Sequence, residues 1–134
     1  MENILVKGEI ARWIKEMMFV AISKDRSCGY CTAAHLACCR MLGVSTGLLD
    51  GLVRDVHGIQ DIKLRDLILF ALKWSRDPQS LAEVDFKQLR DHGLKQSGIV
   101  EVIAMPAFAV YANLIADATR MSPEEMFETI GPSA

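Results

Sequence analysis

The sequence lacks the features that would place it in several common classes. None of its 134 residues lie in a stretch that alternates polar and apolar side chains over a strand's length, which argues against a β fold. The net charge of −2 gives no case for binding nucleic acid or an anionic membrane. No basic segment leading into an apolar core opens the chain, and the longest apolar runs, such as 103–112, are too short to span a bilayer. We therefore expect neither a nucleic-acid partner nor a membrane.

The sequence has four cysteines but no secretion signal, which suggests a reducing compartment such as the cytoplasm. In that setting a closely spaced cysteine pair is more often catalytic or metal-binding than a structural disulfide. The length and the apolar fraction of 51% suit one domain over residues 1–134 with a single core.

Apolar residues recur at helical spacing through most of the chain. The pattern predicts helices over about 5–23, 27–41, 45–53, 62–76, 85–92 and 97–120, with a short last helix from 122 to 131. Ser45, Asp61 and Asp85 are predicted caps, and Pro106 should kink or split the long apolar segment. The predicted fold class is all-α, a bundle of six or seven helices.

The most informative stretch is Cys28-Gly-Tyr-Cys31, followed by His35. The preceding residues 23–27 resemble a turn, so Cys28 falls at the N-terminus of the second helix, and Cys31 and His35 share one helix face. The unpaired N–H groups of a helix start stabilise a thiolate, and a second thiol at this spacing can close a disulfide. The stretch therefore predicts a two-cysteine redox centre in which His35 accepts or relays a proton from Cys31.

Glu16 is the predicted partner of His35. If the first two helices form an antiparallel hairpin that turns near residue 25, position 16 stands across from position 35. A carboxylate facing the imidazole would fix its tautomer and raise its basicity. The predicted proton path is thus Glu16, His35 and Cys31, with Cys28 as partner thiol.

Other readings of these residues stay open. Zinc could be bound by Cys28, Cys31, His35 and a fourth ligand, although the absence of a second cysteine pair at zinc spacing favours redox chemistry and no bound metal. Cys38 and Cys39 lie deeper along the same helix, away from its N-terminus, and are predicted to be small buried apolar residues.

The spacing of Glu16, Cys28-Gly-Tyr-Cys31 and His35 resembles the signature of the alkylhydroperoxidase D-like (AhpD-like) proteins of the carboxymuconolactone decarboxylase superfamily. The runs 64–74, 77–78 and 84–93 are similar to its peroxidase-related branch. The decarboxylase members lack the cysteine pair, so decarboxylation is disfavoured.

The resemblance implies an all-helical fold that assembles as a homo-oligomer, a trimer or hexamer. It implies a peroxide- or disulfide-reducing activity that needs no metal or organic cofactor. Cys31 would be the peroxidatic thiol and Cys28 the resolving thiol, with His35 and Glu16 as proton relay. An external dithiol of the lipoyl or thioredoxin type would restore the pair.

The chain departs from the family pattern in two ways. The position between the cysteines that is a second histidine in well-characterised peroxidases is Tyr30 here. Many peroxidase-related members have additional N-terminal helices, whereas the first helix predicted here is the one that carries Glu16. An alternative function is therefore a redox sensor or general disulfide oxidoreductase without significant peroxidase turnover.

Overall fold

The computed structural model describes residues 7–122, and in that range all regular structure is helical. The helices are α2 (Arg12–Asp25), α3 (Gly29–Met41), α4 (Thr46–Arg54), α5 (Ile62–Arg76), α6 (Glu83–Asp91) and α7 (Gln96–Ala118), with 3₁₀ turns at Val56–Gly58 and Pro78–Ser80. The predicted all-α class is confirmed. The helix predicted over 122–131 falls, apart from Ser122, outside the described residues.

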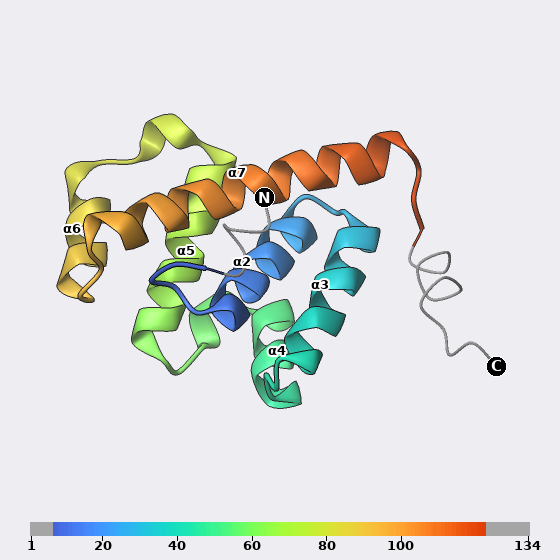
Figure 1. The fold of residues 1–134 in the computed structure, drawn as a ribbon, viewed down its shortest axis with the longest axis horizontal. Helices are drawn as coiled ribbons and strands as arrows, with labels where there is room; N and C mark the ends of the chain where they lie inside the picture. Colours follow the sequence, from blue (N-terminus) through green and yellow to red (C-terminus); the bar gives the residue numbers. More distant parts are fainter. Residues whose placement is uncertain (1–6, 123–134) are drawn as a thin grey trace.

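Helix α2 is the centre of the bundle. It packs against α3, α4, α5 and α7, and Figure 1 shows α7 lying across it as the longest helix. Nine consecutive residues, from Lys15 to Ser23, are buried. A helix enclosed on all sides has no face for solvated charges, so each polar side chain on it needs a partner inside the protein.

The start of α2 differs from the prediction. The apolar pattern suggested a beginning near residue 5, whereas the helix begins at Arg12 and residues 7–10 form bends. Gly8 adopts a φ of 125°, which is outside the helical region and favours glycine. The Glu101 carboxylate of α7 accepts hydrogen bonds from the backbone N–H groups of Glu9, at 2.7 Å, and Ile10, at 2.9 Å. A tertiary contact therefore holds these residues out of the helix.

Most predicted helix ends are confirmed. Leu48 donates its backbone N–H to the Ser45 hydroxyl, and Leu64 donates to the Asp61 carboxylate. The prediction for Asp85 was wrong, because α6 begins two residues earlier, at Glu83. Asp85 instead reaches back from the first turn and accepts the N–H of Ala82 at 2.8 Å, while its carboxylate also binds Lys73.

Pro106 does not split the long apolar helix, since α7 continues through it for 23 residues (Figure 1). Proline removes one N–H donor and disturbs the turn before it. In that turn the Ile103 carbonyl accepts a hydrogen bond of 2.7 Å from the indole N–H of Trp74 on α5. The carbonyl that loses its helical donor is that of Val102, four residues before Pro106, so the Trp74 bond does not replace the missing one. It instead ties α7 to α5 at the next residue.

Helix α7 is long and apolar enough to cross a membrane by length and composition. The expectation that the apolar runs are too short holds for 103–112 but not for the whole helix. In this fold α7 packs against α2 and α5, and these contacts bury the inner side of the helix. Its outer side still exposes Val100, Tyr111, Leu114 and Ile115, and burial of that side in a homo-oligomer stays a prediction.

Lys15 and Glu101 provide a test of this architecture. The Lys15 ammonium is buried and lies 3.0 Å from the Glu101 carboxylate, besides donating to the Lys7 carbonyl. We expect Glu101→Gln to lower the free energy of unfolding by about 3 kcal/mol, because it removes a carboxylate that neutralises a buried ammonium. Urea unfolding measures the change. The matched control is Glu83→Gln, which removes an exposed ion pair with Arg90 and should change little; equal effects of the two variants would contradict the buried-pair account.

Candidate functional site

The cysteine pair is positioned by the short turn between α2 and α3. Ser27 adopts a left-handed φ of 58°, which reverses the chain direction after α2 ends. The Cys28 backbone N–H then donates to the Ser23 carbonyl at 2.8 Å, and Cys28 becomes the N-cap residue of α3. The prediction that this pair lies at the start of the second helix in the chain is confirmed, and Cys31 falls in its first turn.

Cys28 and Cys31 are free thiols, and both are buried, with exposed fractions of 0% and 4%. Burial raises the pKa of Cys28 to about 12, and the neighbouring Cys31 and Asp117 side chains act in the same direction. The Cys31 backbone N–H opposes this rise but does not outweigh it. For Cys28 the stabilising effect that we expected from the helix N-terminus is therefore smaller than the cost of desolvation, and Cys28 stays a protonated thiol near neutral pH.

The predicted juxtaposition of Glu16 and His35 is present. The Nδ1 atom of His35 lies 2.5 Å from Oε2 of Glu16, and the Glu16 side chain is only 1% exposed. The imidazole also stacks on Phe19 of α2, with ring centroids 3.5 Å apart and ring planes 16° apart. Two contacts with α2 thus fix the ring's orientation and leave Nε2 as the nitrogen that does not face Glu16.

Cys31 and His35 line the same pocket, which has a volume of about 300 Å³. Tyr30 and Ala34 of α3 complete this side, and the opposite wall consists of the last turns of α7 with Met121, namely Tyr111, Ala112, Ile115, Ala116 and Met121. The lining is mainly apolar. Tyr30, the position at which the sequence departs from the family pattern, is therefore a wall residue of this pocket.

Cys38 is the residue that sequence reasoning misjudged. It is only partly buried, and its sulfur and the ligand atoms of Glu16 and His35 all lie within 4.8 Å of one another. Its place three residues after His35, on the same stripe as Cys31, was the signal that could have revealed it. Cys39 matches its prediction, since it is fully buried and burial raises its pKa to about 12.

The zinc site considered from the sequence is not assembled. It would require the ligand atoms of Cys28, Cys31 and His35 to converge, but in residues 7–122 the convergent set of such atoms is Glu16, His35 and Cys38. The Nδ1 atom of His35 is occupied by Glu16 of α2.

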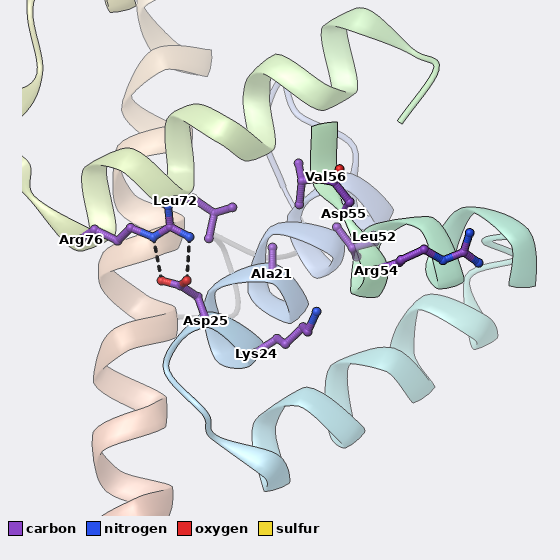
Figure 2. Close-up of a pocket in the computed structure, with 9 residues that line it drawn as sticks. All are labelled: Ala21, Lys24, Asp25, Leu52, Arg54, Asp55, Val56, Leu72 and Arg76. Carbon is purple, nitrogen blue, oxygen red and sulfur yellow. Dashed lines mark hydrogen bonds and ion pairs between the residues drawn. The ribbon is translucent and has the colours of Figure 1, made fainter. Parts of the chain in front are cut away.

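A second cavity, of about 320 Å³, lies between α2, α4 and α5 (Figure 2). Its charged lining includes Asp25 and Arg76, which form a bidentate ion pair at 2.9 and 2.6 Å. That pair lowers the pKa of Asp25 and ties the end of α2 to the end of α5. The lining contains no cysteine or histidine, and the ion pair lies beside the turn that leads to Cys28.

Solved structures of other proteins are similar to this fold. No family model matches the chain, and no curated protein matches it. A crystal structure of an uncharacterized peroxidase-related protein from Silicibacter sp. TM1040 is similar, with a TM-score of 0.85 and 28% identity, over 91% of this chain and 65% of that one.

A second similar structure is titled alkylhydroperoxidase AhpD core, an uncharacterized peroxidase-related protein from Ralstonia eutropha JMP134. Its TM-score is 0.82 at 27% identity, over 87% of this chain and 63% of that one. This chain thus spans less than two thirds of either protein. It resembles the AhpD-like, peroxidase-related proteins in fold and in sequence, as its motifs predict.

Proposed function

We propose that the protein is a thiol-dependent peroxide reductase that uses Cys31 and Cys28 as a redox pair. The observation that carries this proposal is the shared pocket of Cys31 and His35, with the imidazole held by a buried carboxylate. The similarity to peroxidase-related structures supports the same chemistry.

In the proposed reaction the Cys31 thiol gives its proton to Nε2 of His35. The thiolate attacks the terminal oxygen of a hydroperoxide, the O–O bond breaks, and Cys31 becomes a sulfenic acid. The leaving alkoxide takes the proton from His35 and departs as an alcohol. Glu16 stabilises the imidazolium in between, because its carboxylate contacts Nδ1.

Cys28 completes the cycle. As a buried thiol with a high pKa it is a poor nucleophile toward peroxide, which leaves the first attack to Cys31. The Cys28 sulfur then condenses with the sulfenic acid, forming a disulfide and releasing water. An external dithiol, of the lipoyl or thioredoxin type, reduces this disulfide and restores both thiols.

We expect Cys31→Ser to abolish dithiol-dependent peroxide consumption, because serine cannot accept oxygen from a peroxide. Cys28→Ser should permit one oxidation per subunit, trapped as sulfenic acid, and then stop. Steady-state peroxide assays and mass spectrometry of the trapped protein measure both effects. Cys39→Ser is the control, as Cys39 lies away from the pocket. Peroxide consumption that continued unchanged in Cys31→Ser would overturn the proposal, and stoichiometric oxidation of wild type without turnover would favour the redox-sensing alternative.

Glu16→Gln tests the relay. It keeps the shape of the side chain but removes the charge that stabilises the imidazolium, so we expect kcat/KM for peroxide to fall about 100-fold and its pH profile to shift. The matched control is Asp66→Asn, which alters a second carboxylate–histidine pair, with His92 at 2.7 Å, outside the pocket. A relay role is ruled out if both variants retain wild-type rates and pH profiles.

A further inference from the structure

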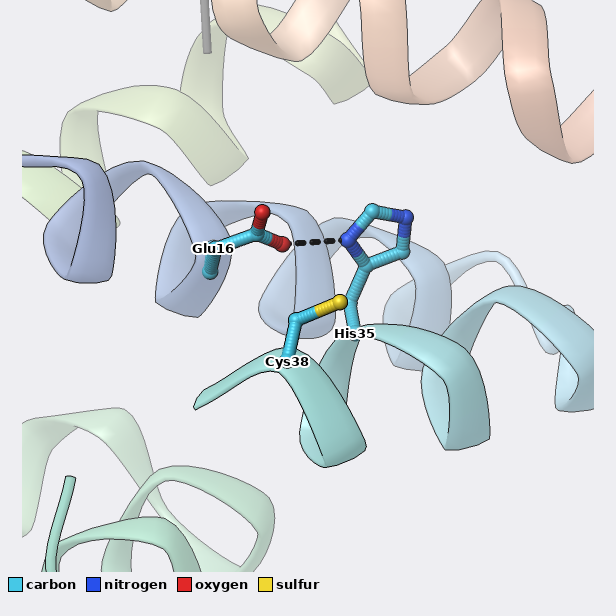
Figure 3. Close-up of side chains that lie close together, drawn as sticks. All are labelled: Glu16, His35 and Cys38. Carbon is cyan, nitrogen blue, oxygen red and sulfur yellow. Dashed lines mark hydrogen bonds and ion pairs between the residues drawn. The ribbon is translucent and has the colours of Figure 1, made fainter. Parts of the chain in front are cut away.

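The cluster of Glu16, His35 and Cys38 has a chemistry that peroxide reduction does not use. Figure 3 shows the Glu16 carboxylate of α2 directed at the His35 imidazole of α3. The Cys38 thiol, also on α3, lies beside this contact. Their ligand atoms all lie within 4.8 Å of one another. One oxygen, one nitrogen and one sulfur donor therefore converge on a single volume.

We propose that Glu16, His35 and Cys38 form a binding site for a thiophilic divalent cation of the Zn²⁺ type. Thiolate, imidazole and carboxylate are the three side-chain ligands that zinc takes in proteins, at about 2.0–2.3 Å each. Three donors bound to one such ion lie roughly 3–4 Å apart, so the Glu16 and His35 atoms need to separate slightly from their contact of 2.5 Å. A fourth position is left for water or another small ligand.

The charges around the cluster favour the binding of a cation. Glu16 is a buried carboxylate, and a divalent ion would compensate its charge more fully than the exposed Arg12, whose Nε lies 3.6 Å from Oε1. Burial raises the pKa of Cys38, the Glu16 charge adds to the rise, and Arg12 opposes it. Because a cation binds the thiolate form of cysteine, binding at Cys38 releases the thiol proton.

The site has a consequence for regulation, which rests on the proposed function. His35 and Glu16 cannot shuttle a proton while both coordinate a cation. Occupancy would therefore inhibit peroxide reduction without touching the cysteine pair, and removal of the ion by a chelator would restore it. The Cys38 thiol, which the proposed reaction does not need, is the residue that separates the two roles.

Co²⁺ titration of the full-length protein, kept reduced with a non-thiol reductant, tests the site. Wild type should bind one equivalent and show the near-ultraviolet absorption of a thiolate–Co²⁺ bond. Loss of an outer-shell partner already weakens metal binding about 10- to 100-fold, so Cys38→Ser should weaken it at least about 10-fold and abolish that absorption. The matched control is Cys39→Ser, one residue further on and fully buried, which should bind as wild type does.

The Cys28→Ser/Cys31→Ser double variant separates this proposal from the proposed function. It cannot reduce peroxide, yet it should retain the cobalt absorption, because neither residue belongs to the cluster. Loss of the absorption in the double variant with retention in Cys38→Ser would overturn the proposal and place the metal on the cysteine pair. Failure of wild type to bind one equivalent at micromolar protein would also overturn it.

X-ray absorption at the zinc edge needs no variant and settles the case in which Cys38→Ser does not fold. One sulfur among nitrogen and oxygen ligands is expected, whereas two sulfurs would contradict the site. If peroxide reduction is present, Zn²⁺ should inhibit wild type at least about 10-fold more strongly than Cys38→Ser. Equal inhibition of the two would remove the regulatory role while leaving the binding result intact.

Discussion

The hydrogen bond between Glu16 and His35 is the contact around which the site is organised, and it follows from the burial of α2. A helix enclosed by four neighbours cannot leave a carboxylate in water, so Glu16 must be satisfied from within. Its partner is the imidazole of His35 on α3. The contact fixes the orientation of the ring and directs Nδ1 toward Glu16. The contact that satisfies the buried carboxylate is therefore also the one on which the proposed proton relay depends.

The same constraint explains the other polar groups on α2. Lys15 is neutralised by Glu101 of α7, and the Ser23 hydroxyl accepts a hydrogen bond of 2.9 Å from Asn113. The first contact joins α2 to α7 near the start of α2, and the second joins them near its end. The central helix is thus located by its polar residues as well as by apolar packing, because each buried donor or charge is satisfied in only one arrangement.

Much of this could be read from the sequence, and the successes and failures have distinct causes. The contact between Glu16 and His35 was predictable because a short turn sets the register of a two-helix hairpin. Helix ends at Ser45 and Asp61 depend on side chains within the same turn, so local chemistry determines them. The start of α2 was not predictable, since it depends on Glu101, which lies 92 residues after Glu9.

Cys38 and Pro106 show the limits of local rules. Counting along a helix placed Cys38 on the stripe of Cys31, but not within reach of a carboxylate from another helix. Proline rules predict a break for an isolated helix, whereas here α7 continues through Pro106, packed against α2 and α5. In both cases the decisive contacts come from other helices.

A further consequence concerns the pocket beside Cys31, one wall of which is formed by the last two turns of α7. Glu101 and Asn113 join that helix to Lys15 and Ser23 of α2, and beyond them the Asp117 side chain reaches Cys28, where it adds to burial in raising the pKa of the thiol. The end of α7 therefore shapes the surroundings of both cysteines, since it walls the pocket beside Cys31 and also acts on Cys28.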